Sequence, residues 1–414
     1  MNSPLSHPAE PKPRLHYGWV IVMAGTLTIF ACLGLARFAF GMLLPSMRTA
    51  LAMSYDDMGL LGTGNFAGYL VAVAVAPLLL RVCTPRILIS IGLFLVAICM
   101  LAISACHSYL PVLILYGIVG IGSGLANIPI MVLVSYWFRQ EKRGRAAGFI
   151  VIGSGFAIIF SGFLVPRLNA AFGETGWRVS WMLLGGVVLL VALVVASLIR
   201  NDPADKGLEP VGRKTALDYD PAETRGRFTT LRILAHLGGL YFIFGATYVI
   251  YGTFIVTTMV EDYGFVEASA GQFWSWVGFF SLFSGTLFGT LSDRIGRKGG
   301  LMAVFGVQTL AYLLAGSRLG DLALFGSVML YGVAAWAIPA IMAAAVGDYL
   351  GKSRAAAAFA MITFCFAIGQ TLGPVAAGEV AEIVGTFTPS YLASAALTAV
   401  AVLLSALLPQ RQQA

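Results

Sequence analysis

Charged residues are scarce in this chain: they make up 11% of its 414 residues, whereas hydrophobic residues make up 58% and the mean hydropathy is +0.86. Soluble domains of this total length need far more polar surface to cover their cores. The composition therefore excludes a string of soluble domains and indicates a membrane protein.

Cysteine and histidine are also few, and their spacing carries no site signature. The five cysteines show no Cys-x-x-Cys spacing and the four histidines are dispersed, which argues against a metal site or a disulfide framework. The stretch "GDYLGKS" at 347–353 is one residue too short between its glycines to be a phosphate-binding loop. With no nucleotide motif, metal cluster or catalytic triad in the sequence, we expect no enzyme activity, no cofactor and no metal.

Long apolar stretches, in contrast, recur along the whole chain. They cover residues 17–44, 57–80, 86–106, 109–137, 146–171, 178–199, 233–260, 268–291, 299–317, 321–346, 355–382 and 388–408. Each is close to the roughly 20 residues that a helix needs to cross a bilayer. The residues before the first stretch hold four prolines and no apolar core, so we expect a retained first span and not a signal peptide. The sequence thus predicts an all-α membrane protein of twelve transmembrane helices.

The basic residues predict the orientation of these helices. Lysine and arginine collect in cytoplasmic loops, and most of the 26 do so here when both termini are placed inside. The opposite loops hold only Arg48, Arg167, Arg178 and Arg318. The net charge of +7 is then a sign of topology and not of nucleic-acid binding. We expect a multi-pass monomer of a bacterial inner membrane with both termini cytoplasmic, whose partners are the lipid bilayer and a small-molecule substrate.

One polar segment divides six predicted spans from six. "RNDPADKGLEPVGRKTALDYDPAETRGR" at 200–227 has a composition that cannot pack a core, so we expect a six-helix bundle at 1–199, a cytosolic linker at 200–232 and a second bundle at 233–414. The halves also echo each other, because Pro129 and Pro339 are separated by the same interval as Phe149 and Phe359. Such an internal repeat is typical of transporters that bind their substrate between two halves.

A charged stretch between the eighth and ninth spans carries a family resemblance. "GTLSDRIGRKGG" at 289–300 resembles the G-x-L-x-D-R-x-G-R-[KR] signature of the major facilitator superfamily. The resemblance extends to the twelve spans, the central loop, "WFRQEKRGRAAG" after span four and "GWRVSW" at span six. It implies two pseudo-symmetric bundles that work by alternating access. In the equivalent loop of the first half, Leu80 stands where the signature has its acid.

The resemblance also implies a gate. A carboxylate at a helix end can meet the positive N-terminus of a neighbouring helix. Asp293, with Arg294 and Arg297, is therefore expected to clasp the start of the fifth span at 144–148, which Arg143 precedes, when the cytosolic ends close. The alternative is that these charges only anchor the topology.

Arg37, in "GLARFAFGMLLP", is the one formal charge away from the ends of the predicted spans, and every Asp and Glu falls in a loop, a tail or a helix end. Ionisable groups at membrane depth are expensive and usually functional, so an anionic substrate is the natural partner of Arg37. The alternatives are that it snorkels to the rim or bonds backbone carbonyls. Further residues that we expect to line the site are Asn65, Asn127, Tyr248, Tyr251, Trp276, Trp336 and Gln370. The alternative for each of them is a contact between helices or a place in the aromatic belt at the membrane interface.

The first span has a narrower resemblance. Tyr17, Gly18 and Trp19, followed by Arg37, resemble the first helix of the monocarboxylate transporter and oxalate/formate exchanger branches. Those branches carry a further basic residue on helix 8 or 11, which is absent here and argues against a dicarboxylate. We expect a secondary active or facilitative transporter of a small organic monoanion. The alternatives are an efflux transporter for drug-like or apolar compounds and a membrane sensor with a transporter fold.

Overall fold

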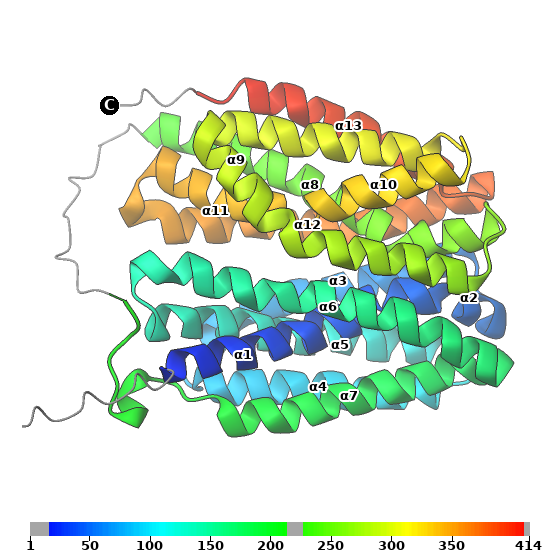
Figure 1. Ribbon diagram of the computed structural model, residues 1–414, viewed down its shortest axis with the longest axis horizontal. Helices are drawn as coiled ribbons and strands as arrows, with labels where there is room; N and C mark the ends of the chain where they lie inside the picture. Colours follow the sequence, from blue (N-terminus) through cyan, green and yellow to red (C-terminus); the bar gives the residue numbers. More distant parts are fainter. Residues whose placement is uncertain (1–15, 213–226, 410–414) are drawn as a thin grey trace, which may run out of the picture.

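The computed structural model describes residues 16–212 and 227–409, and these are almost wholly helical, with no β-strand among them. Figure 1 shows two bundles of roughly parallel helices, one holding α1 to α7 and the other α8 to α13, lying alongside each other. The expected all-α architecture of two helix bundles is confirmed.

The first bundle contains α1 (Tyr17–Ile29), a π-helix η1 (Phe30–Phe38), α2 (Phe40–Leu51), α3 (Tyr55–Leu79), α4 (Pro85–Ser104), α5 (Tyr109–Trp137), α6 (Gln140–Phe172), the short η2 (Gly173–Thr175) and α7 (Gly176–Leu198). After the short η3 (Pro203–Lys206), the second bundle contains α8 (Arg227–Glu261), α9 (Glu267–Gly316), α10 (Asp321–Ala334), α11 (Ala337–Leu350), α12 (Lys352–Val384) and α13 (Thr388–Ala406).

The helix count agrees with twelve crossings. Within the described residues, ten continuous segments are long and apolar enough to cross a membrane. Two of these, Glu141–Leu198 and Glu267–Gly316, are too long for one crossing. The first is divided by η2, and the second is broken at Gly296, whose φ of 83° is left-handed and suits glycine. Each of the two therefore makes two crossings.

Two crossing segments are interrupted near their middles. The first changes from α1 through η1 to α2, with the amide of Ala39 donating to the carbonyl of Gly34 five residues earlier. The segment of α10 and α11 breaks at Ala335–Trp336, where the Trp336 amide donates to Oγ of Ser284 at 3.0 Å. Such π-helical and broken turns often mark functional sites. Here they bring Phe38 and Trp336 to a ring-centroid distance of 5.1 Å across the two bundles.

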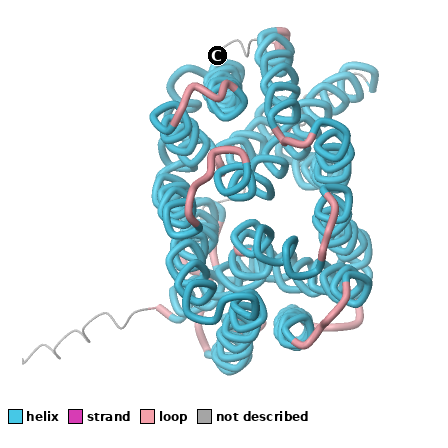
Figure 2. Tube along the Cα trace, turned by 90° about the vertical axis from the view of Figure 1, so that its right-hand side faces the viewer, coloured by secondary structure: helices cyan, strands magenta, loops and turns pink. Residues whose placement is uncertain are grey.

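The bundles meet along α3 with α12 and along α6 with α9. We call the end of the molecule that holds Tyr17, Leu198 and Ala406 the proximal end, and the end that holds Leu51 and Glu261 the distal end. Figure 2 looks along the helices at the distal end.

Glycines make the distal seam tight. A Cβ on Gly59 would lie 2.7 Å from the carbonyl oxygen of Pro374, and one on Gly162 would lie 2.5 Å from that of Gly271. Small residues allow such close helix contact in membranes. Towards the proximal end, in contrast, a Cβ on Gly148 or Gly289 would meet nothing within 4 Å. The halves are closed distally and apart proximally.

The linker is structured at both of its ends. Val211 pairs with Phe138 as an isolated parallel bridge, and its amide donates to the carbonyl of Trp137 at 2.9 Å. Arg139 forms an ion pair of 2.8 Å with Glu209. The first part of the linker is thus fastened to the turn between α5 and α6, and α8 already begins at Arg227, inside the predicted 200–232. Linker residues 213–226 and most of the predicted tail lie outside the described residues.

Candidate functional site

Arg37 lies in η1 with 7% of its surface exposed, and it is the only charged side chain among the buried residues that the structure describes. Its guanidinium carbon is 4.5 Å from the ring centre of Phe66 and 4.4 Å from that of Tyr69. Its Nε donates to Oδ1 of Asn65 at 3.3 Å. A side chain so enclosed does not snorkel to the rim, and its guanidinium is held by side chains of α3.

Three positions on α3 form this setting. Asn65, Phe66 and Tyr69 lie within about one helical turn, so one face of α3 presents all three to Arg37. Asn65 is fixed in turn because its Nδ2 donates to the carbonyl of Tyr116 at 3.0 Å. Nδ2 of Asn127, on α5, donates to the Tyr69 hydroxyl at 2.7 Å. Asn65 and Asn127 thus belong to the same group as Arg37.

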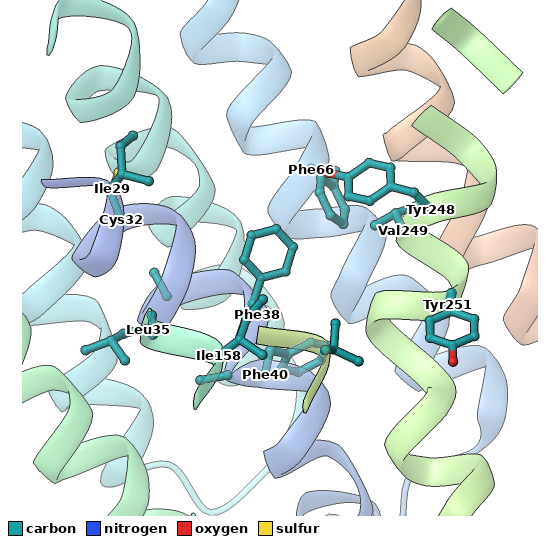
Figure 3. Close-up of a cluster of buried hydrophobic side chains, with 14 of the residues drawn as sticks. Ile29, Cys32, Leu35, Phe38, Phe40, Phe66, Ile158, Tyr248, Val249 and Tyr251 are labelled. Atoms are coloured by element: carbon teal, nitrogen blue, oxygen red, sulfur yellow. The ribbon is translucent and has the colours of Figure 1, made fainter. Parts of the chain in front are cut away.

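The second bundle contributes Tyr248 of α8, Gln370 of α12 and Trp336. Nε2 of Gln370 donates to the Tyr248 hydroxyl. The Trp336 ring lies 6.3 Å from the ring of Tyr248 as well as against Phe38, so it links Tyr248 to the residue next to Arg37. Figure 3 shows Phe38 and Phe66 of the first bundle facing Tyr248 of the second. We call Arg37, Asn65, Asn127, Tyr248, Trp336 and Gln370, with Phe66 and Tyr69, the central group.

Three buried polar atoms of the central group have no hydrogen-bond partner among the described residues: Nη2 of Arg37, Nε1 of Trp336 and Oε1 of Gln370. Buried polar atoms are nearly always paired, and an unpaired buried cation is the most costly case. No carboxylate of the described chain forms an ion pair with Arg37. The group therefore offers two donors, one of them cationic, and one acceptor, drawn from both bundles.

Tyr251 and Trp276 lie apart from the central group. The Tyr251 hydroxyl bonds Oγ of Ser327 at 2.9 Å and its ring stacks on Tyr331 at 4.0 Å, inside the second bundle; Figure 3 shows this hydroxyl turned away from Phe38. Trp276 is 44% exposed and packs beside Phe280 at 5.7 Å. Such an exposed ring on an apolar helix fits the belt or lipid-facing alternative.

Three of the four expected gate residues are engaged within their own bundles. Asp293 accepts from Arg297 at 2.6 Å, and Nε of Arg297 donates to Asp348 at 2.7 Å. Arg143 donates to the carbonyls of Phe138 and Ser135, both at 2.9 Å. Arg294 is exposed. The clasp between Asp293 and the start of α6 is not formed in this proximally open state, and it stays a prediction for the closed one.

Sequence reasoning did not foresee the polar contacts that close the distal end. Arg48 of α2 pairs with Glu261 of α8 at 2.7 Å, and the Tyr55 hydroxyl donates to the same carboxylate at 2.8 Å. The Tyr55 amide donates to Glu382 of α12 at 2.8 Å. We call Arg48, Tyr55, Glu261 and Glu382 the distal lock. In the sequence these are ordinary polar or charged residues near helix ends, and only their pairing across the two halves gives them a role.

A second distal contact joins the same halves. Nδ2 of Asn169, at the end of α6, donates to Glu267 at 2.7 Å and to Oγ of Ser46 at 3.2 Å. Among the residues described, no group of three or more histidine, cysteine or acidic side chains could hold a metal ion.

Comparison with known proteins gives one family match that spans most of the chain. The family model described as "Uncharacterised MFS-type transporter YbfB" matches residues 29–406. Human monocarboxylate transporter 2 is 21% identical over 96% of this chain and 86% of its own length. The probable hexose phosphate transport protein of Chlamydia trachomatis is 23% identical over 75% of this chain and 72% of its own.

Among solved structures, similarity extends to a bacterial homolog of the human lysosomal transporter Spinster, in an inward-facing and occupied conformation. The TM-score is 0.72 at 15% identity, and the match covers 95% of this chain and 97% of that one. The family and these relatives are transporters and not enzymes.

Proposed function

The chain belongs to the major facilitator superfamily of membrane transporters, and on that basis we propose that it carries a small organic monoanion, of the monocarboxylate kind, by alternating access. The proposal rests on Arg37. Among the described residues it is the only charged side chain that is buried, and its Nη2 has no hydrogen-bond partner. One cation neutralises one negative charge. Two of the relatives are by name transporters of anions, monocarboxylates in one case and hexose phosphates in the other.

The proposed roles follow from the contacts. Arg37 holds the carboxylate, and its rigid fork is oriented by Asn65 and by the rings on either side. On the opposite bundle, the free Nε1 of Trp336 donates to the anion and the free Oε1 of Gln370 accepts from a polar group of the substrate. A substrate that touches both bundles favours the state in which they are closest, which is how binding biases the exchange between open states.

The orientation is proposed from the basic residues. Lysine and arginine are concentrated at the proximal end, which we therefore place in the cytoplasm of a bacterial inner membrane. The structure then represents the carrier open to the cytoplasm. The buried described residues include no carboxylate that could relay a proton, which favours exchange or facilitated movement over tight proton symport.

A second candidate, efflux of an apolar compound, is favoured by one feature. Tyr241, Phe244, Tyr248 and Phe366 form a stack beside Gln370, with Tyr241 and Phe366 at 4.5 Å and Phe244 and Tyr248 at 4.8 Å. Stacked aromatic rings of this kind suit a flat apolar ligand. It explains neither the unpaired guanidinium nor its burial, so we rank it second.

Uptake into proteoliposomes tests the two candidates. Labelled monocarboxylates, their neutral amide analogues and a panel of apolar cations are compared, with and without an imposed pH gradient. We expect saturable uptake of a monocarboxylate and none of its amide, and loss of that uptake in Arg37→Gln. Equal uptake of acid and amide, or transport of apolar cations alone, would overturn the proposal in favour of the second candidate.

A further inference from the structure

An apolar groove of about 520 Å³ runs between α1 and α6 near the proximal end. Its lining residues are Trp19, Val22, Met23, Thr26, Leu27, Phe149, Ile152 and Phe156. Met23 is 51% and Phe156 is 50% exposed, so large apolar side chains face outwards there. In a chain that crosses the bilayer, an outward apolar surface of this kind meets lipid and not water.

Thr26 carries the one hydroxyl among the residues that line the groove, and this hydroxyl is already hydrogen-bonded. Oγ1 of Thr26 donates to the carbonyl of Val22 at 2.9 Å and to that of Phe149 at 3.2 Å, which satisfies it and joins α1 to α6. The rings of Trp19 and Phe149 meet edge to face at 6.0 Å and form the proximal wall. The groove is thus suited to a hydrocarbon chain.

A cation stands at the proximal mouth. The guanidinium carbon of Arg145 lies 5.9 Å from the Trp19 ring and 5.8 Å from the Phe149 ring, and the side chain is exposed. No acid of the described residues forms an ion pair with it. Lys142, about one turn nearer the proximal end of α6, is exposed as well. The rings position the guanidinium while its N–H groups stay available.

The dimensions fit one leaflet. Trp19 and Leu27 are separated by about 12 Å along a helix axis, at about 1.5 Å per residue, and half of the hydrocarbon core is about 15 Å. A lipid whose headgroup lies at Arg145 would therefore place an acyl chain beside Met23 and Phe156, within the hydrocarbon part of the leaflet.

We propose that this groove is a binding site for an anionic phospholipid of the leaflet at the proximal end, with the phosphate and anionic headgroup on Arg145 and one acyl chain between α1 and α6. Charge decides the occupant: a zwitterionic lipid would fill the apolar part equally well, but only an anionic headgroup gains net attraction from Arg145 and Lys142. The site is independent of what the central group transports, since none of its residues belongs to that group.

Contact quenching of Trp19 tests the proposal. The full chain is reconstituted in phosphatidylcholine vesicles that contain either phosphatidylglycerol or phosphatidylcholine brominated on its acyl chains. The Trp19 signal is taken as the difference between the parent and Trp19→Phe. We expect brominated phosphatidylglycerol to quench this signal at several-fold lower mole fraction than brominated phosphatidylcholine.

Two variants on α6 test whether Arg145 causes the preference for the anionic lipid. Arg145→Gln should lower the preference for phosphatidylglycerol about fivefold, which corresponds to about 1 kcal/mol for one basic side chain near an anionic surface. Arg167→Gln removes an arginine that lies over the Phe163 ring at the distal end of the same helix, and it should leave the preference unchanged. Equal quenching by the two lipids in the parent, or an unchanged preference in Arg145→Gln, would overturn the proposal and leave an ordinary lipid-facing surface.

Discussion

Arg48 of the first bundle and Glu261 of the second form an ion pair of 2.7 Å at the distal end, and the ring of Tyr55 lies 4.0 Å beneath the Arg48 guanidinium. The pair therefore exists only while the distal ends are together. Both side chains are partly exposed, at 29% and 22%, so the contact is weak enough to open during a transport cycle.

Glu261→Gln should shift the carrier towards its distally open state. Exposed pairs of this kind contribute about 0.2 to 1 kcal/mol, so the open population should rise by up to about fivefold. The measurement is the distribution of distances between spin labels on the distal ends of α2 and α8. Arg318→Gln is the control, because its pair with Asp262, at 3.5 Å, lies within the second bundle. A shift of equal size in both variants would show that Glu261 has no particular role in holding the halves together.

Gly162→Ala should disfavour the same closed seam by a steric route. The new methyl would lie 2.5 Å from the Gly271 carbonyl oxygen, and overpacking of this kind costs about 1 to 3 kcal/mol. Gly289→Ala, in open space, should not shift the distance distribution. The idea fails if both alanines leave the distal distances as they are in the parent.

Arg37→Gln should abolish binding of the anion without lowering the melting temperature of the ligand-free protein, because it removes a desolvated charge that has no counter-ion. Arg37→Lys should keep part of the affinity, since a point charge replaces a bidentate fork. The readout is thermal stabilisation by ligand, which for the parent reaches about 2.7 kcal/mol at a hundredfold excess over Kd. Undiminished stabilisation of Arg37→Gln would remove Arg37 from the binding site.

Asp293→Asn should favour the proximally open state. In the open structure Asp293 is exposed, and its one described ion pair is with Arg297, so the substitution costs the open state little stability. The closed state would lose the predicted clasp on α6, which is worth about 0.5 to 2 kcal/mol. Labelling of a reporter cysteine near the proximal end should increase. Leu80→Ala, in the loop that lacks the acid, should label like the parent. If Asp293→Asn also labels like the parent, the loop serves only as a topology anchor.

Transport should not be driven by a pH gradient alone. With a monocarboxylate whose pKa is far below the working pH, we expect counterflow by unlabelled substrate to exceed pH-driven accumulation, since the buried described residues include no carboxylate to carry a proton. Strong accumulation under an imposed pH gradient would contradict this and point to a titrating group elsewhere in the chain.

The helices could be predicted closely because their signal is long and one-dimensional. The stretch 109–137 coincides with α5, and the isolated charge of Arg37 was visible against an apolar background. The sequence also suggested Asn65, but it did not identify the two aromatic rings that contact Arg37. Phe66 is one of 27 phenylalanines, and nothing in the sequence says which of them stacks on the guanidinium.

The distinction between Tyr248 and Tyr251 shows the same limit. Three residues apart on α8, one contacts Gln370 and the other Ser327, because their side chains leave the helix in different directions. Most residues around them on α8 are apolar or aromatic, so the sequence shows no polar face from which that direction could be read. The distal lock was missed for a related reason, since the pairing of Arg48 with Glu261 depends on the contact of two bundles that are far apart in sequence.

The unpaired guanidinium of Arg37 has an electrical consequence under the proposed function. A carrier that reorients while empty moves an uncompensated positive charge through part of the membrane field, where a full elementary charge is worth about 2.3 kcal/mol per 100 mV. Once a monoanion is bound, the same movement is electrically neutral. Membrane voltage would then act on the reorientation of the empty carrier and not on that of the loaded carrier. A negative interior would therefore favour the empty carrier in its cytoplasm-facing state.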